Sequence, residues 1–153
     1  LTDAYDRESM GASTERHNAR YELNREAQDQ VAALSHQRAS AAQTAAVFDD
    51  EIVPVAVPQR RGEPVLVTAD EGIRPDTTVE SLAGLRAAFA EGGSITAGNS
   101  SQISDGASAV IVTTRGIAEA KGWPVLVTIG ASGQTAGPDN SLQAQPARAI
   151  EQA

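Results

Sequence analysis

Apolar positions recur at three- and four-residue steps over the first third of the chain, which predicts helices there. Residues 13–22 suit a polar surface helix, and Asn24 is a good N-cap for the next one. From Arg25 to Ala46 the sequence is rich in alanine and glutamine, without glycine or proline, which predicts one long helix. We expect its narrow apolar stripe to pack closely against a neighbouring element. The stripe consists of Ala27, Val31, Leu34, Ala42 and Ala45.

Two short β-branched segments follow and predict a hairpin. Residues 52–57 are strand-like, and Pro54 restricts them to an edge or bulged strand because proline cannot donate to a ladder. Residues 64–68 form the second strand, and the connecting residues 58–63 give the hairpin a long basic tip.

A further helix is predicted after residue 77. Thr77 and Glu80 have the spacing of a capping box, in which each side chain satisfies a free amide of the other residue. Leu82, Leu85 and Phe89 are expected to form the buried face of this helix.

Two continuous apolar runs, residues 109–113 and 125–129, have the pattern of strands buried on both faces. They predict a layered α/β sheet. The short helix expected at residues 117–121 leaves barely enough chain for a parallel crossover. The runs are therefore expected to belong to different sheets, with a domain boundary near Gly122.

The composition fits one soluble domain of 153 residues with 41% hydrophobic and 21% charged residues. The net charge of -8 argues against a nucleic-acid partner or an anionic membrane surface. The chain has no cysteine, so it holds no disulfide, no cysteine-bound metal and no thiol nucleophile. No apolar run approaches the roughly 20 residues of a membrane helix. These features predict a cytoplasmic protein.

The ends of the sequence allow two interpretations. The chain starts at Leu1 without a methionine, and it stops at Ala153 inside a helical pattern that begins only after Pro146. It is either a piece of a longer chain or a domain with trimmed ends.

Isolated polar residues give few candidates for chemistry. His17 and His36 lie on separate predicted helices without metal-ligand spacing, so we expect solvated or cap-associated histidines. The acidic residues 49–51 and 70–71 are expected to be solvated flanks rather than a general acid–base pair. Arg60 and its neighbour Arg61 could meet a phosphate, although a solvated turn is the simpler interpretation.

The densest polar stretch is residues 96–108, which joins a helix end to an apolar run. Its small residues would let a ligand approach the backbone, and its hydroxyls and amides could hold an amide-bearing ligand. The same residues could instead form a tight turn that satisfies its own backbone. Both interpretations stay open on these residues alone.

This stretch resembles a known family signature. Residues 96–101, T-A-G-N-S-S, with residues 104–107, S-D-G-A, are similar to the T-A-[GA]-N-[AS]-S…D-G-A signature of thiolases. Further motifs resemble those of the family in the same order along the chain. They are S-M-G at 9–11, R-E-A-Q-D at 25–29, F-D-D-E-I-V-P-V at 48–55, D-E-G-I-R at 70–74 and L-A-G-L-R-A-A-F at 82–89. The sequence is identified as a member of this family, and residues 136–141 favour its acetyl-CoA acetyltransferases.

The resemblance implies an α/β fold and a middle segment of a thiolase. Residues 1–103 would form the mostly helical loop (lid) domain with its small β-hairpin, which binds coenzyme A. Residues 104–122 would be the last strand and helix of the N-terminal αβαβα half. Residues 123–153 would open the C-terminal half.

The reaction implied by the resemblance is the reversible Claisen condensation of two acetyl-CoA molecules to acetoacetyl-CoA and CoA. Coenzyme A takes part as a substrate, so no cofactor is expected. The family's catalytic cysteines and histidine lie in motifs that do not occur here. We therefore expect no catalytic residue in this chain and no activity from it alone. A degradative 3-ketoacyl-CoA thiolase and a non-catalytic thiolase-like binding module are the alternatives.

The resemblance also assigns roles to single residues. Arg74 matches the arginine that packs on the adenine of coenzyme A, and Ser81 matches a residue of the same groove. Ala97 and Ser101 match positions on the pantetheine arm, where the Ser101 hydroxyl can bond an amide.

Apolar lining near the acyl end would come from Leu1, Met10 and Ile103. Ser9 stands where some biosynthetic members carry histidine, which leaves the acyl-chain preference open. His36 stands where a potassium-using member has tyrosine, so no potassium or other metal site is expected.

The expected partners follow from the same resemblance. They are acetyl-CoA or CoA, the rest of a thiolase chain, and further copies in a homodimer or homotetramer. The implied setting is fatty acid metabolism in the cytoplasm, without nucleic acid or membrane.

Overall fold

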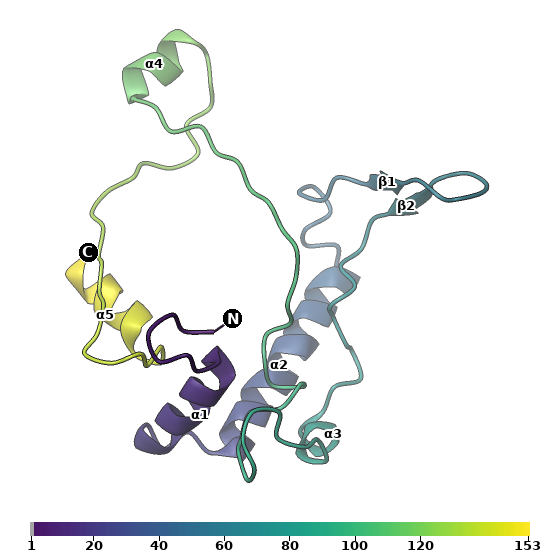
Figure 1. The fold of residues 1–153 in the computed structure, drawn as a ribbon. Coiled ribbons are helices and arrows are strands. Elements are labelled where there is room, and N and C mark those ends of the chain that lie inside the picture. Colours follow the sequence, from purple (N-terminus) through teal and green to yellow (C-terminus); the bar gives the residue numbers. More distant parts are fainter. Residues whose placement is uncertain (1) are drawn as a thin grey trace. The chain divides into compact units, whose positions relative to one another are not determined.

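Figure 1 shows the computed structural model of the chain, which describes residues 2–153. The chain divides into two compact units, Leu1–Gln102 and Ile103–Ala153, and each is described by itself. None of the helices in the described part is long and apolar enough to cross a membrane.

Two capped helices are the longest elements of the first unit. Helix α1 spans Met10–Arg20, and the hydroxyl of its N-cap Ser9 accepts a hydrogen bond from the Ala12 amide. Helix α2 spans Arg25–Thr44, and its N-cap Asn24 accepts from the Ala27 amide at 2.8 Å. The predicted long helix and its N-cap are confirmed.

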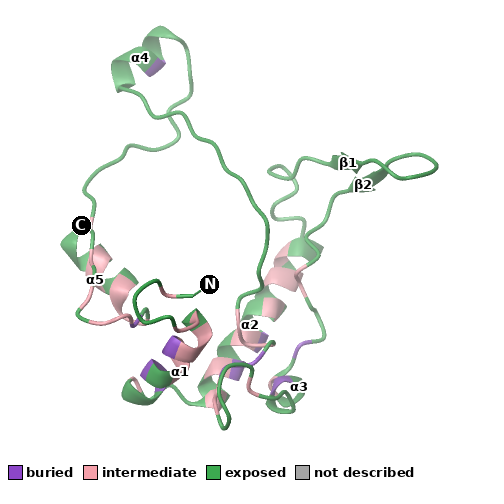
Figure 2. Cartoon of the chain, viewed as in Figure 1, coloured by how far each residue is buried: buried purple, intermediate pink, exposed green. Residues whose placement is uncertain are grey.

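The buried face of α2 differs from the predicted stripe. Val31 is 70% exposed and Leu34 is 43% exposed, whereas Asp29 and Ala33 are each 1% exposed. Figure 2 shows buried, intermediate and exposed residues along α2. The helix turns this face, one carboxylate and one methyl group, toward α3 and the loop at residues 94–99. The predicted stripe was wrong because a buried carboxylate with hydrogen-bond partners can occupy the packed face of a helix. Apolar periodicity does not detect such a residue.

The predicted hairpin is confirmed. Strand β1, Val55–Val57, pairs antiparallel with β2, Val65–Val67, with Ala56 opposite Leu66. Pro54 lies immediately before β1, where it removes no ladder hydrogen bond. Every residue of both strands is exposed, so the hairpin has no core of its own.

Helix α3, Val79–Ala83, packs on α2 and begins one residue later than expected. The capping box is formed by Thr78 and Ser81, whose hydroxyls each accept the amide of the other, at 3.2 Å and 3.0 Å. The prediction of Thr77 with Glu80 was wrong because a serine hydroxyl at N3 can close the box as a glutamate does. Leu82 is buried, but Leu85 and Phe89 lie beyond the helix and are 41% and 43% exposed.

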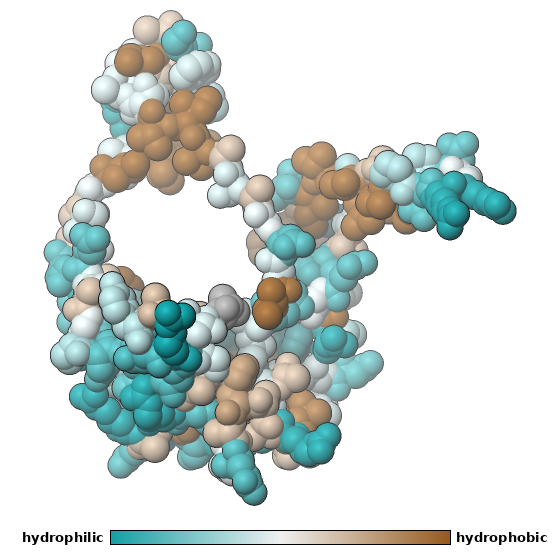
Figure 3. All heavy atoms as spheres, viewed as in Figure 1, coloured by the Kyte–Doolittle hydropathy of each residue, from teal (hydrophilic) through white to brown (hydrophobic). Residues whose placement is uncertain are grey.

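The second unit contains helix α4, Arg115–Ala120, and helix α5, Gln145–Gln152, which has proline in its first turn. The short helix predicted between the apolar runs is confirmed. Residues 109–113 and 125–129 are not strands, and their apolar side chains are exposed, reaching 88% at Leu126. Figure 3 shows hydrophobic surface gathered near α4 and along the hairpin.

The prediction of buried strands is therefore wrong for the described chain. An apolar run becomes a buried strand only where a neighbouring strand pairs with its backbone and other elements cover its faces. Within residues 2–153 the ladder of β1 and β2 is the one sheet, so these runs have no strand beside them.

Candidate functional site

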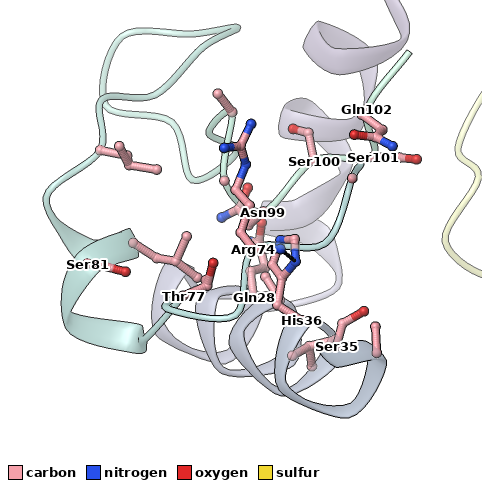
Figure 4. Close-up of a pocket in the computed structure, with 18 of the residues that line it drawn as sticks. Gln28, Ser35, His36, Arg74, Thr77, Ser81, Asn99, Ser100, Ser101 and Gln102 are labelled. Carbon is pink, nitrogen blue, oxygen red and sulfur yellow. Dashed lines mark hydrogen bonds between the residues drawn. The ribbon is translucent and has the colours of Figure 1, made fainter. Parts of the chain in front are cut away.

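A groove of about 1020 Å³ lies within the first unit (Figure 4). One wall is a face of α2. Residues four apart on the helix form this face, namely Ala27, Val31, Ser35 and Ala39. The other walls come from α3 and two loops. They contribute Gly72, Ile73, Arg74, Thr77, Ser81, Leu82, Leu85 and residues 97–102.

An ion pair with a buried carboxylate holds these walls together. Asp29 accepts from Arg25 Nε at 2.7 Å through Oδ2 and from Asn99 Nδ2 at 2.9 Å through Oδ1. The Arg25 guanidinium also donates to the carbonyl oxygens of Leu82 and Leu85. One pair from the first turns of α2 thus ties together α2, the end of α3 and the 97–102 loop.

The 96–100 segment closes on itself. The Thr96 amide donates to Asn99 Oδ1 at 2.7 Å, and the amides of Gly98 and Asn99 donate to Thr96 Oγ1. The Ser100 hydroxyl donates to the Thr96 carbonyl at 2.7 Å. The tight-turn interpretation is therefore correct for these residues. The same turn presents Ala97 and its neighbours to the groove, so the two interpretations are compatible.

Several polar side chains of the groove have no hydrogen-bond partner within residues 2–153. They include the guanidinium of Arg74 and the hydroxyls of Ser35 and Ser101. The Arg74 backbone amide is held, since it donates to Nδ1 of His36 at 3.2 Å across the groove wall, as the dashed line in Figure 4 marks. The groove therefore offers a cation and a hydroxyl to a ligand.

Four of the predicted site residues lie together along this groove, namely Arg74, Ser81, Ala97 and Ser101. Met10, the first residue of α1, and Ile103, at the start of the second unit, are not part of its lining. Leu1 lies outside the described residues.

His17 and the two hairpin arginines do not line this groove. His17 is buried at 5% exposure in the last turn of α1, where its carbonyl accepts the amide of the C-cap residue Tyr21, so of the two expected settings, solvated or cap-associated, the solvated one was wrong. Arg60 and Arg61 are exposed on the hairpin loop. Among the described residues, no cluster of three or more histidine, aspartate or glutamate side chains could hold a metal ion.

Residues that sequence reasoning missed connect separate motifs. Gln28 donates from Nε2 to the Ser94 hydroxyl at 2.9 Å, and a side chain at Gly11 would collide with the Phe89 ring. Asp29 and Asn99, which lie in separate motifs, are likewise joined by a hydrogen bond. The sequence did mark these residues, because each of them except Ser94 lies in a family motif. The motifs do not show which of these residues are in contact in the fold.

Glu15 of α1 fastens the 94–95 segment. Its carboxylate accepts from the Ser94 amide and hydroxyl, both at 3.0 Å, and from the Ile95 amide at 2.6 Å. Burial, the largest single influence, raises the pKa of Glu15, but the hydrogen bonds from Ser94 and Ile95 and the charge of Arg25 together lower it below its ordinary value.

Replacing Glu15 with glutamine should change the response of stability to acid. A carboxylate with a lowered pKa in the folded state stabilises the fold above its unfolded pKa, and this contribution is lost as the pH falls through the folded pKa. Urea unfolding at a series of pH values should show wild type more stable than Glu15→Gln at neutral pH, with the difference vanishing in acid. A constant difference at all pH values would contradict this role, and Glu26→Gln on exposed α2 surface is the control.

The sequence matches the family description "Thiolase, N-terminal domain" over residues 1–116. This chain belongs to the thiolase family. The match includes every residue of the groove lining and extends into α4.

Thiolase relatives cover the chain at substantial identity. A probable acetyl-CoA acetyltransferase of Mycolicibacterium smegmatis is 54% identical over all 153 residues, which are 39% of its own length. The crystal structure of the Bacillus anthracis acetyl-CoA acetyltransferase matches with a TM-score of 0.75 and 40% identity over 81% of this chain and 31% of that one. Human mitochondrial 3-ketoacyl-CoA thiolase in complex with CoA matches with a TM-score of 0.57 and 35% identity, over 64% of this chain and 24% of that one.

The chain thus has a thiolase-like fold in part, and it spans about 39% of the length of the curated relatives that match all of it. These relatives are named acetyl-CoA acetyltransferases or acyltransferases.

Proposed function

We propose that this chain is the coenzyme A-binding segment of an acetyl-CoA C-acetyltransferase. In that reaction two acetyl-CoA molecules give acetoacetyl-CoA and CoA, reversibly. The chain would form the loop domain and edge pieces of the two αβαβα halves. Because it has no cysteine, the thiols that carry out acyl transfer in thiolases must come from elsewhere, and the chain alone would be inactive.

The observation that supports this most strongly is the shared position of Arg74 and Ser101. They lie on different loops but line one groove, and their guanidinium and hydroxyl have no partner within the described chain. The groove volume of about 1020 Å³ is at the upper end of the range for small-molecule sites.

The chemistry of the groove suits the parts of coenzyme A. A planar guanidinium stacks on an aromatic base and pairs with phosphate oxygens. A hydroxyl can donate to or accept from a pantetheine amide. The alanine-rich face of α2 leaves room for an extended chain to lie along the helix. The role of the segment would be to hold and orient the thioester, which lowers a reaction barrier by fixing the geometry of approach.

Arg74→Ala should weaken CoA binding about tenfold, equivalent to about 1.4 kcal/mol, because it removes the groove's unpaired guanidinium. Ser101→Ala should weaken binding less, by about threefold, since one neutral hydrogen bond contributes about 0.5–1.5 kcal/mol. Isothermal titration of the protein with CoA measures both. Arg38→Ala, an exposed arginine of α2 outside the groove, is the matched control and should bind as wild type does. Equal affinities for the Arg74 and Arg38 variants would refute the proposed site.

The preference for short acyl chains is part of the proposal. The mycobacterial relatives and the Bacillus anthracis structure carry the acetyltransferase name, whereas the match to the human 3-ketoacyl-CoA thiolase covers less of this chain. Comparable rates of an active protein on long and short 3-ketoacyl-CoA substrates would favour the degradative alternative. A non-catalytic binding module would bind CoA as a mature product of 153 residues. Intact mass measures the length of that product.

We further propose a cytoplasmic homodimer or homotetramer acting in fatty acid metabolism, as thiolase family membership suggests. The exposed apolar strands of the hairpin are compatible with contact to another polypeptide surface.

A further inference from the structure

One side of the β1–β2 hairpin is a face of four valines. Two cross-strand pairs point to this side of the ladder, one pair near the base of the hairpin and one near its tip. They are Val55 with Val67 and Val57 with Val65. The four side chains are 37% to 59% exposed, and no other helix or strand of the described chain packs on the hairpin. The valine face is therefore an apolar surface without a partner inside the chain.

The two ends of the hairpin carry opposite charge. The tip has Arg60 and Arg61 with a single carboxylate, Glu63, and neither arginine has an ion-pair partner within residues 2–153. The base, residues 47–54 and 68–73, has five carboxylates and no cation. Figure 3 shows the hydrophobic strands and the hydrophilic tip. Because extended strands separate the tip from the base, these charges do not meet within one copy.

The base of the hairpin also contains a hollow of about 460 Å³. Its lining is mostly apolar, and it includes the Phe48 ring and the carboxylates of Asp49 and Asp70. A guanidinium suits such a place, since it pairs with carboxylates and lies favourably over an aromatic ring. The hollow shares only Ala39 and Ile73 with the larger groove. The base thus has the chemistry to receive an arginine side chain like those of the tip.

A two-fold axis would bring these surfaces together. An axis between two valine faces, perpendicular to the strands, places the tip of each copy over the base of the other. The valine pair near the tip then lies against the partner's pair near the base. The spacing agrees, because Arg60 comes four residues after the central Ala56, and Ile52, in the lining of the hollow, comes four residues before it. One hairpin therefore carries both halves of a self-complementary contact.

We propose that two copies of this chain associate through their hairpins, with valine face against valine face and Arg60 and Arg61 of each copy at the acidic hollow of the other. The inference goes beyond coenzyme A binding and uses neither Arg74 nor Ser101. One hairpin face and one tip from each copy form a small contact, and small contacts bind weakly, so we expect a Kd of about 10–100 μM.

Charge reversal at each end tests the contact. The tip variant is Arg60→Glu with Arg61→Glu, and the base variant is Asp49→Arg with Asp50→Arg and Glu51→Arg, all at exposed positions. Sedimentation velocity near the wild-type Kd should show a mixture of monomer and dimer for wild type. Each variant alone should associate at least about tenfold more weakly, because like charges then face each other.

Mixing the two variants is the decisive arm. In a dimer of one tip variant with one base variant, the acidic tip meets a base in which arginines outnumber carboxylates, and the native tip meets the native base. The equimolar mixture should therefore recover the dimer that neither variant forms alone. This recovery would also show that both variants fold. A monomeric wild type, a variant that associates as wild type does, or a mixture that stays monomeric would overturn the proposal.

The valine face is tested separately. Val57→Thr with Val65→Thr keeps the β-branched shape that suits a strand but adds hydroxyls to the face, and it should weaken association about tenfold. Leu66→Thr is the matched control, because Leu66 points to the opposite side of the ladder and is 60% exposed. It should associate as wild type does. Equal losses in the two proteins, or none in the double variant, would contradict a contact through the valine face.

Coenzyme A binding distinguishes this inference from the proposed function. The hairpin strands and tip lie outside the larger groove, so the tip variant should bind CoA as wild type does. If the hairpin variants leave the dimer intact while Arg74→Ala weakens CoA binding, the inference fails and the proposed function stands. If wild type dimerises through the hairpin but does not bind CoA, the inference stands and the proposed function fails.

Discussion

Asp29→Ala should destabilise the first unit by about 3 kcal/mol, the largest stability effect expected from a single substitution in this chain. Asp29 is 1% exposed and accepts from both Arg25 and Asn99. Its removal leaves the guanidinium without a carboxylate and the Asn99 amide without an acceptor, and unpaired buried polar groups are costly. The Arg25 side chain is partly exposed, which keeps the effect at the lower end of the range for buried pairs.

Urea unfolding followed by helical circular dichroism measures this effect. Glu26→Ala is the matched control, because it removes an exposed carboxylate from the same end of α2 and should cost less than about 1 kcal/mol. A loss for Asp29→Ala no greater than that for Glu26→Ala would show that the ion pair does not hold the groove walls together.

Gly98→Ala should be the second most disruptive change, at about 1–3 kcal/mol, with weaker CoA binding as well. A Cβ atom at Gly98 would collide with Leu82 Cδ2 and lie 2.6 Å from Leu85 Cδ1. Leu85 can move into solvent, but Leu82 is buried at 4% exposure and has little room. The turn would therefore shift, and with it Ala97 and the rest of the groove edge.

The same unfolding experiment, combined with CoA titration, tests this expectation. Gly106→Ala is the control, since a Cβ there meets nothing within 4 Å and stability should stay within about 0.5 kcal/mol of wild type. A Gly98→Ala protein with wild-type stability and affinity would mean that the turn does not need its close approach to α3.

Local signals in the sequence predicted the long helix α2 and the hairpin, whereas the helix after residue 77 is shorter than expected. The N-cap at Asn24, the uninterrupted helix formers after it and the β-branched residues around Pro54 act through neighbouring residues, which a sequence displays directly. The buried face of α2 could not be obtained in this way. It depends on Asp29 finding Arg25 and Asn99, and the latter partner lies 70 residues further along the chain.

The apolar runs at 109–113 and 125–129 were predicted to be strands, but they are not strands in the structure. Their pattern indicates side chains suited to burial, but a strand forms only beside a neighbouring strand, and no strand pairs with them in the described residues. For the site, the thiolase motifs indicated Arg74 and Ser101, which the structure places on one groove. His36 was expected to be solvated or cap-associated, because nothing local marks a histidine whose partner is a backbone amide 38 residues away.

Mapping bound coenzyme A onto the protein by amide chemical shifts tests the central claim most directly. The account predicts that CoA shifts the resonances of Arg74, Ser101 and the adjoining face of α2, while those of the β1–β2 hairpin stay in place. Saturable shifts confined to residues outside the groove, or no shifts at millimolar CoA, would contradict it.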